Sequence, residues 1–276
     1  MIVAGIDVGG KNVHIVIKKD GQVLGKVTGP SGIKKAEAVE QLYDEILKKA
    51  GLSRKDVERV VATGSAAKRV AFANGAVPDA AADARGVIKL IPTARTIIDV
   101  GAEEGRAIKI SPEGKVLDIA INEKCAAGTG TFIEAMSRAL EVSVDEMSKI
   151  TLQSTQTLST NAQCAVFGES EVVSLIHQKT PKHDIARAVM NAISGRIASV
   201  ARIVGLEKDV VMVGGMAKNA GFVDSLKKTI DMDVKVPEDP DYMGALGAAE
   251  AALAGVMTEE VKAKVLEKET VSEGKA

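Results

Sequence analysis

Residues 6–24 read IDVGGKNVHIVIKKDGQVL, and residues 98–117 repeat the pattern as IDVGAEEGRAIKISPEGKVL. Each copy contains a β-branched run, the triplet Asp-Val-Gly, a tight turn, a second alternating run, a glycine turn and a third run. Alternating β-branched residues between glycine turns predict a three-stranded meander. A helical pattern follows each copy, at residues 34–50 and 131–140. An internal repeat of this kind predicts two similar α/β domains that face each other.

Two aspartates occupy the same place in the two copies. Asp7 is followed by Gly9, and Asp99 is followed at the same offset by Gly101. A glycine turn lets backbone N–H groups approach a phosphate, and a nearby aspartate can hold magnesium through water. One Asp-Val-Gly triplet is also ordinary hairpin chemistry, because turns select Asp and Gly. Two copies in register favour a nucleotide-binding cleft.

A third glycine cluster lies within residues 210–219, VVMVGGMAKN. The apolar run predicts a buried strand that breaks at Gly214 and Gly215 and leads to a helix. Ligands of open α/β sheets bind beyond the carboxyl ends of the strands, so these glycines and Asn219 are candidates for contact with an adenosine. A plain strand-to-helix turn is the alternative. Residues 242–252 carry small side chains at close spacing, which predicts a helix that packs tightly or acts as a hinge.

The chain has two cysteines, Cys125 and Cys164, and a predicted helix follows each of them. The positive end of a helix dipole favours a thiolate, which is the form that binds metal. Two thiolates cannot complete a four-thiolate iron–sulfur site, but two copies across a symmetric dimer could do so. The pattern therefore suggests a cluster shared between subunits. The alternative is that both cysteines are buried and inert, as free cysteines commonly are.

Composition narrows the classes of partner. The chain has 276 residues, a net charge of −1 and 2% aromatic residues. Neither the charge nor the aromatic content favours nucleic-acid binding. No basic leader precedes the first strand pattern, and no run reaches the roughly 18 apolar residues that span a bilayer. We expect a soluble cytoplasmic protein without nucleic-acid or membrane partners.

Taken together, these elements resemble the superfamily of acetate and sugar kinases, heat-shock chaperone ATPase domains and actin, over nearly the whole chain. Residues 7–10 look like its first phosphate motif, residues 99–101 like its second, and residues 214–215 like its adenosine motif. The resemblance implies an α/β fold of two actin-like, sugar-kinase-like (ribonuclease H-like) domains around a nucleotide cleft.

The implied domain division is discontinuous in sequence. The first ATPase domain would comprise residues 1–95 and residues 245–276, which hold the C-terminal helices. The second would comprise residues 96–244 and would carry both cysteines.

A more specific resemblance surrounds the cysteines. Residues 122–130, NEKCAAGTG, look like the signature of the ATPase activators of 2-hydroxyacyl-CoA dehydratases, which the ATPase subunits of benzoyl-CoA reductase share. Residues 167–174 and 83–86 match further segments of that family. In the family, two cysteines per subunit hold one 4Fe–4S cluster at a dimer interface, and Cys125 and Cys164 fall on both positions. The resemblance implies ATP-dependent electron transfer from a reductant such as ferredoxin to catalytic acyl-CoA reductase or dehydratase subunits.

The phosphate loops differ from the usual activator pattern at Lys11 and Glu103. Glu103 is a candidate to accept a proton from the attacking water, and a solvated loop acid is the alternative. Residues 99–106, DVGAEEGR, look more like a benzoyl-CoA reductase ATPase subunit than a stand-alone activator. We therefore expect the benzoyl-CoA reductase type of function first, and that of a 2-hydroxyacyl-CoA dehydratase activator second. The dimer partner is a second copy or a related ATPase subunit.

The predicted catalytic residues are Glu103, Asp7 and Asp99, and the predicted cluster ligands are Cys125 and Cys164. The predicted cofactor-binding residues, for ATP or ADP with Mg²⁺, are Asp7, Gly9, Gly10, Lys11, Asn12, Gly101, Ala102, Glu103, Gly128, Thr129, Gly130, Gly214, Gly215 and Asn219. Two alternative functions remain. One is a small-molecule kinase of the same fold, such as an amino-sugar kinase, and the other is a non-hydrolysing scaffold subunit that holds the cluster.

Overall fold

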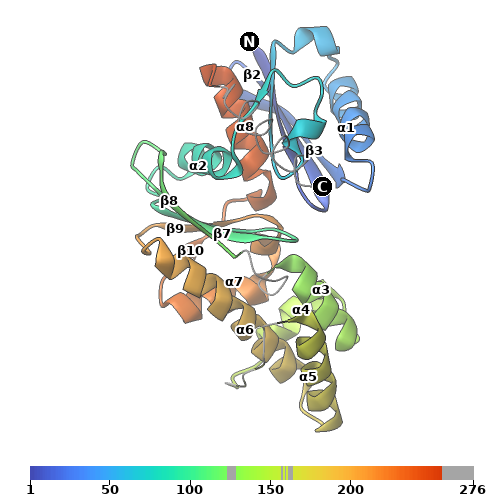
Figure 1. Ribbon diagram of the computed structural model, residues 1–276, viewed down its shortest axis with the longest axis vertical. Coiled ribbons are helices and arrows are strands. Elements are labelled where there is room, and N and C mark those ends of the chain that lie inside the picture. The colour runs from blue at the N-terminus through green and yellow to red at the C-terminus, as the bar shows by residue number, and fades with distance from the viewer. Residues whose placement is uncertain (123–128, 157, 159, 161–163, 257–276) are drawn as a thin grey trace, which may run out of the picture. The chain divides into compact units, whose positions relative to one another are not determined.

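The computed structural model describes residues 1–122, 129–156, 158, 160 and 164–256. The chain divides into two compact units: unit 1 is Met1–Lys89 with Tyr242–Ala276, and unit 2 is Leu90–Asp241. Each unit has a five-stranded sheet in which three antiparallel strands continue into parallel ones (Figure 1). The two similar α/β units that the sequence repeat predicts are confirmed.

Unit 1 begins with the predicted meander, and its strand order is β3-β2-β1-β4-β5. Its elements in chain order are β1 (Ile2–Val8), β2 (Asn12–Lys19), β3 (Gln22–Pro30), α1 (Lys35–Lys49), η1 (Arg54–Asp56), β4 (Arg59–Thr63), η2 (Ala67–Arg69), β5 (Gly75–Ala76), α2 (Asp79–Leu90) and, at the end, α8 (Met243–Ala254). Side chains alternate between the faces of a sheet. Ala4, Ile6 and Val8 of β1 join the core under α1, whereas Gly5 faces α8. The two helices therefore cover opposite faces of this sheet (Figure 1).

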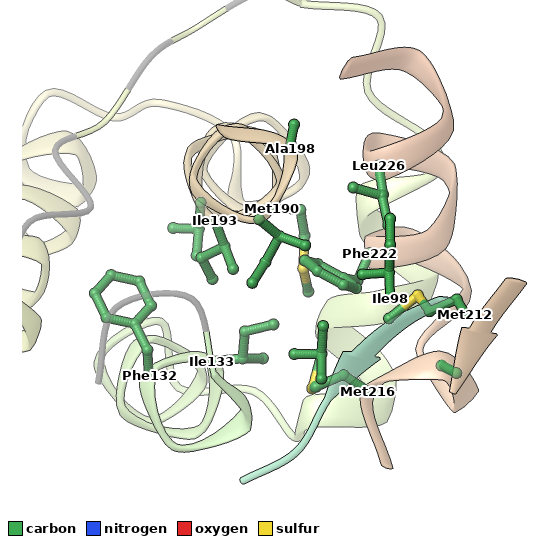
Figure 2. Packing of buried hydrophobic residues seen from close by; sticks show 14 of the residues in the cluster. Ile98, Phe132, Ile133, Met190, Ile193, Ala198, Met212, Met216, Phe222 and Leu226 are labelled. Atoms are coloured by element: carbon green, nitrogen blue, oxygen red, sulfur yellow. The ribbon is translucent and has the colours of Figure 1, made fainter. Parts of the chain in front are cut away.

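Unit 2 repeats the meander and has the strand order β10-β9-β6-β7-β8. Its elements in chain order are β6 (Thr96–Val100), β7 (Gly105–Ile110), β8 (Val116–Ile121), α3 (Gly130–Ala139), α4 (Val144–Thr151), α5 (Ala165–His177), α6 (Lys182–Ile203), β9 (Val210–Val213), η3 (Gly215–Lys218), α7 (Ala220–Ile230), β10 (Val234–Lys235) and η4 (Pro240–Tyr242). Figure 2 shows Ile98 of β6, Ile133 of α3, Met190 of α6 and Phe222 of α7 turned toward one another. This apolar core joins the helices to one face of the sheet.

Helix α8 lies in backbone contact with its neighbours in unit 1. A Cβ atom added to Gly5 of β1 would lie 2.0 Å from the carbonyl oxygen of Ala245, and one added to Gly247 would lie 1.7 Å from that of Ala82 in α2. Lys18 of β2 adds an ion pair to Glu250 on the same helix. The close packing predicted from the small residues of this segment is confirmed.

None of the described helices is both long enough and apolar enough to cross a membrane. The longest of them, α6, has 22 residues and carries Asp184 and Arg187 among its buried positions.

Replacing Gly247 tests the backbone contact between α8 and α2. We expect Gly247→Ala to destabilise the protein by about 1–3 kcal/mol, because the methyl group forces the two helices apart. Urea unfolding measures the change. The matched control is Gly195→Ala in α6, where an added Cβ meets no atom within 4 Å. The free energy of unfolding of that control should rise by about 0.5–1 kcal/mol, because alanine loses less backbone entropy on folding than glycine does. Equal effects of the two substitutions would contradict the close contact.

Candidate nucleotide-binding loops and cysteine helix

Asp7 and Asp99 hold equivalent positions in the two sheets. Asp7 lies on β1 opposite His14 of β2, and Asp99 lies on β6 opposite Arg106 of β7. Each aspartate is one residue from the carboxyl end of its strand. The structure therefore gives the two predicted phosphate motifs the same strand register.

The turns that follow the two aspartates also match. Gly9 donates its backbone N–H to the carbonyl oxygen of Asn12 at 2.9 Å, and Gly101 donates to that of Glu104 at 2.9 Å. Each of these hydrogen bonds closes a tight turn between the first two strands of its unit. The two loops thus share backbone geometry as well as sequence.

Each aspartate lies against a glycine at the end of the neighbouring parallel strand. Gly64 follows β4 with φ of +93°, and Gly214 follows β9 with φ of +83°. A Cβ atom on Gly64 would lie 2.4 Å from Oδ1 of Asp7, and one on Gly214 would lie 2.4 Å from Oδ1 of Asp99. Only glycine tolerates this positive φ together with such an approach. Gly64 is not among the predicted site residues, although the valine-rich run before it carries the same signal as the run before Gly214.

The unit 1 loop is held through its carbonyl groups. Ser31 donates its hydroxyl to Gly10 O at 2.9 Å and its backbone N–H to Lys11 O at 2.7 Å. Lys35, the first residue of α1, donates its ammonium group to Gly9 O at 3.2 Å. The hydrogen bonds from the end of β3 and from α1 pre-organise this loop, as a phosphate cradle requires.

The unit 2 loop is held from a different element, the first turn of α3. Gly130 donates its backbone N–H to Gly101 O at 2.9 Å. Thr131 donates both its backbone N–H, at 3.0 Å, and its hydroxyl, at 2.5 Å, to Ala102 O. The predicted cofactor residues Gly101, Ala102 and Gly130 are thereby brought together.

Three predicted side chains lie at the tips of these loops. Lys11 and Asn12 are exposed in unit 1, and Glu103 is exposed in unit 2. A charged group at an exposed loop tip can contact a phosphate or a water molecule without a rearrangement of the core.

A second carboxylate accompanies Asp7 near the start of α8. A Cβ atom on Gly244 would lie 2.9 Å from Oδ2 of Asp7 and 3.5 Å from Oδ1 of Asp83. Asp83 is buried on α2. The first turn of a helix offers backbone N–H groups and a positive dipole end, which stabilise nearby carboxylates. The resemblance to the family includes residues 83–86. Local sequence patterns do not reveal that Asp83 lies beside Asp7 and Gly244, because α2 and α8 lie far apart in the chain.

In unit 2, the equivalent aspartate has a cationic partner. Nε of Arg106 lies 3.2 Å from Oδ2 of Asp99, and Nη2 lies 3.2 Å from Oε1 of Glu104. The side chains of Arg106 and Asp99 are 13% and 15% exposed. In unit 1 the same register position holds His14, whose ring packs edge-on against Tyr242 at 5.1 Å between centroids. The two loops therefore differ in the type of side chain that faces their aspartates.

The predicted adenosine motif lies at the end of β9. Gly215 begins η3, and Asn219 caps α7 by accepting the backbone N–H of Phe222 at 2.9 Å. The Nδ2 atom of Asn219 is buried and has no hydrogen-bond partner among the described residues. A buried donor beside a glycine turn suits a polar ligand such as a nucleoside, since an unsatisfied buried donor is costly.

Cys164 lies at the start of α5, as predicted. It is the N-cap residue, is partly exposed, and accepts the first helical hydrogen bond from Gly168 at 2.9 Å. The exposed apolar side chains of Val166 and Phe167 follow it in the first turn. On the other side of α5, a Cβ atom on Gly168 would lie 2.9 Å from Cζ of Phe132, so α5 packs closely against α3.

Cys125 and Gly128 lie outside the described residues. Thr129 is buried and is the N-cap residue of α3. Within the part of the chain that is described, no three His, Cys, Asp or Glu side chains gather as a metal site. The described residues thus include one predicted cluster ligand, the Cys164 thiol at the N-terminus of α5.

Comparison with known proteins places these features in a family. Residues 4–252 match the BadF/BadG/BcrA/BcrD ATPase family. The chain belongs to this family.

Its relatives include dehydratase activators and a component of a reductase. The activator of lactoyl-CoA dehydratase from Anaerotignum propionicum is 39% identical over 255 residues, 90% of this chain and 96% of that protein. The 2-hydroxyisocaproyl-CoA dehydratase activator from Clostridioides difficile is 35% identical over 255 residues, 90% and 94% of the two chains. One of the subunits of benzoyl-CoA reductase from Thauera aromatica is 33% identical over 216 residues, 76% of each chain.

Solved structures agree with the fold. The activator of 2-hydroxyisocaproyl-CoA dehydratase from Clostridium difficile with bound ADPNP has a TM-score of 0.87 and 32% identity, and the match covers 96% of this chain and 98% of that one. A ROK family glucokinase from Streptomyces griseus has a TM-score of 0.58 and 14% identity, and the match covers 92% of this chain and 100% of that one. This likeness shows the shared actin-like, sugar-kinase-like fold alone.

These matches correct the preference for a benzoyl-CoA reductase type. The dehydratase activators match at 35–39% identity over about nine-tenths of this chain, whereas the reductase component matches over 76% of it. The preference came from residues 99–106, a short loop that carries far less information than the full length.

A double-mutant cycle tests the ion pair in the unit 2 loop. Asp99→Asn and Arg106→Gln should each cost about 1–3 kcal/mol, because each removes one charge of an ion pair whose side chains are only 15% and 13% exposed. The double substitution should cost less than the sum by about 1 kcal/mol or more. Urea unfolding of the four proteins gives the coupling energy. The exposed Glu45–Lys49 pair on α1 is the control. Its coupling energy should be about 0.3–0.5 kcal/mol. Additive costs for Asp99 and Arg106 would show that the two side chains do not interact.

Proposed function

We propose that this protein is an ATP-dependent activator of a 2-hydroxyacyl-CoA dehydratase. In this role it passes an electron from a reductant such as ferredoxin, through a 4Fe–4S cluster shared by two subunits, to the catalytic dehydratase. The observation that carries the proposal is the 39% identity to a dehydratase activator over 90% of this chain. The duplicated Asp-x-Gly loops and the thiol that begins α5 support it, because they supply the groups for nucleotide binding and for cluster binding.

Nucleotide binding is assigned to the glycine motifs of each unit. In unit 1 the loop at residues 9–12 contacts phosphate, and Asp7 holds Mg²⁺ through water. In unit 2 the loop at residues 101–103 contacts phosphate beside Asp99, and residues 214–219 contact the adenosine. The pre-organised loops and the buried amide of Asn219 support these roles. A related activator structure carries bound ADPNP.

Cluster binding is assigned to Cys125 and Cys164. When bound, a 4Fe–4S cluster supplies a one-electron carrier whose potential depends on hydrogen bonds and solvent exposure around it. Two thiolates are half of a four-thiolate set, so a second subunit must provide the others, from a second copy or a related ATPase subunit. The exposed Val166 and Phe167 beside Cys164 support an interface at this end of α5, because apolar side chains are stabilised by burial.

Glu103 is assigned the role of orienting the attacking water. It is a carboxylate at the exposed tip of the unit 2 phosphate loop, where it can accept a proton from water. If the chain were a non-hydrolysing scaffold, Glu103 would be only a solvated acid. ATP turnover separates these two functions.

The substitution Glu103→Gln tests hydrolysis. We expect kcat for ATP to fall about 100-fold, because proton acceptance by a positioned carboxylate contributes at least about that factor. The nucleotide Kd should stay within about threefold, since the amide keeps the shape of the side chain. Phosphate release and isothermal titration give the two values. Glu113→Gln, in the exposed turn between β7 and β8, is the matched control with wild-type turnover. Unchanged turnover in the Glu103 variant would remove the assigned role, and no turnover in the wild type would favour the scaffold.

Iron and acid-labile sulfide, measured on protein purified without oxygen, test the cluster. About two irons per chain should be present, as one four-iron cluster per dimer requires. Cys125→Ser and Cys164→Ser should each lose them while retaining nucleotide binding, which shows that the variants fold. Co-expression with the partner subunit provides the second setting, because an obligate heterodimer can lose its cluster when separated. Iron-free protein in both settings would leave an ATPase with two structural cysteines.

A further inference from the structure

The glycines that touch the two repeated aspartates are held in different ways. In unit 1, Gly64 donates its backbone N–H to Oδ1 of Asp79 at 2.8 Å. In unit 2, Gly214 donates its backbone N–H to the carbonyl oxygen of Pro240 at 2.9 Å. A side-chain carboxylate therefore accepts in unit 1 the hydrogen bond that a backbone carbonyl accepts in unit 2.

The residue opposite each aspartate in the sheet differs as well. Thr63 of β4 lies opposite Asp7 in the parallel ladder, and its hydroxyl donates to the same Oδ1 atom of Asp79 at 3.2 Å. Val213 of β9 takes the equivalent place opposite Asp99. One oxygen atom of Asp79 thus binds both the residue opposite Asp7 and the glycine that follows it, whereas a valine side chain cannot make such a bond.

Backbone contacts bring Asp79 to this place. Asp79 is the first residue of α2 and is half-buried. Two residues before it, Val77 donates its backbone N–H to the carbonyl oxygen of Ala62 in β4 at 2.9 Å. The start of α2 is therefore fixed beside β4, and its first side chain reaches the end of that strand.

The position of Gly64 in turn determines where the Asp7 carboxylate lies. A Cβ atom on Gly64 would lie 2.4 Å from Oδ1 of Asp7 and 2.6 Å from the carbonyl oxygen of Val8, so the glycine backbone packs directly on both. Glycine has the most conformational freedom of all residues, and the hydrogen bond to Asp79 restricts it at this position. Restricting it matters for Asp7, because Mg²⁺ requires nearly ideal octahedral geometry from its ligands and their waters.

We propose that Asp79 is a positioning residue for Asp7, and thereby for the Mg²⁺ of the bound nucleotide. Asp79 itself does not contact the cation. It fixes Gly64, and Gly64 fixes the carboxylate that faces the cation. The inference rests on the proposed function in that Asp7 holds Mg²⁺ through water.

Magnesium-dependent binding of ADP tests this role. Isothermal titration gives the magnesium effect, which is the Kd for ADP in EDTA divided by the Kd for ADP with Mg²⁺. The wild type should show an effect of about tenfold or more and Asp79→Ala should lose most of it, because loss of a group that orients a metal ligand costs about 10–100-fold in metal affinity. The Kd in EDTA should stay within about twofold of the wild-type value, as expected for a residue that does not contact the ligand.

Asp79→Asn is the matched control, because its amide oxygen can still accept the N–H of Gly64. It removes the negative charge at the start of α2 and keeps the acceptor, so it should retain most of the magnesium effect. A merely structural role of Asp79 would weaken ADP binding equally with and without Mg²⁺ and leave the ratio unchanged. That result, or a wild-type ratio in Asp79→Ala, would overturn the proposal.

Two further variants keep the test decisive if Asp79→Ala does not fold. Asp79→Ser retains a side chain that is favoured at helix starts but is too short to reach Gly64, so it should lose the magnesium effect. Thr63→Val removes the longer of the two hydrogen bonds to Asp79 and leaves that of Gly64, so it should keep the effect. An equal loss in Thr63→Val and Asp79→Ser would overturn the pathway through Gly64.

The failure of the proposed function is distinguishable from the failure of this inference. Absence of ADP binding by the wild type with and without Mg²⁺ would overturn nucleotide binding and the role of Asp79 together. ADP binding by the wild type that does not respond to Mg²⁺ would overturn the metal role of Asp7, and with it that of Asp79. Loss of the magnesium effect in Asp7→Asn but not in Asp79→Ala would overturn the role of Asp79 alone and leave the proposed function standing.

Discussion

Both units depend on a carboxylate held against a glycine backbone at the ends of two parallel strands. Asp7 meets Gly64 and Asp99 meets Gly214, with no space for a Cβ atom in either contact. The contact joins the first strand of each meander to the next parallel strand of its sheet. It also sets where the carboxylate lies relative to the turn that follows. A side chain at either glycine would displace the aspartate, and with it the start of the loop.

The duplicated loops have kept this backbone geometry and diverged in what surrounds it. His14 faces Asp7 and packs on Tyr242, whereas Arg106 forms an ion pair with Asp99. The positive charge of Arg106 weakens the attraction of Asp99 for a divalent cation. The elements that hold the two loops also differ. Ser31 and Lys35 bind the unit 1 loop, whereas the first turn of α3 binds the unit 2 loop. Helix α3 begins at Gly130, close in the sequence to Cys125. The repeat therefore supplies two similar cradles with different chemical neighbours.

The family's function does not come from the fold alone. A glucokinase shares the fold at 14% identity, and a fold of this kind hosts many activities whose chemistry belongs to particular sites. In this chain, unit 2 carries the closely packed helices α3 and α5. Cys164 lies at the mouth of one of these helices, partly exposed and next to exposed apolar side chains. This combination of access and apolar surface suits the role that we propose for Cys164 in a cluster shared between subunits.

The sequence by itself determined the features that repeat locally. The two meanders, the helices after them, the Asp-x-Gly turns and the helix that begins after Cys164 all follow from short-range periodicity and turn chemistry. The full-length similarity decided the family, while an eight-residue loop was too short to choose the reductase over the activators. Only the tertiary structure decided which distant residues meet: Gly64 with Asp7, Asp83 beside Gly244, and Thr131 with Ala102. Periodicity reports which face a residue takes, and only packing reports which backbone or side chain lies opposite that face.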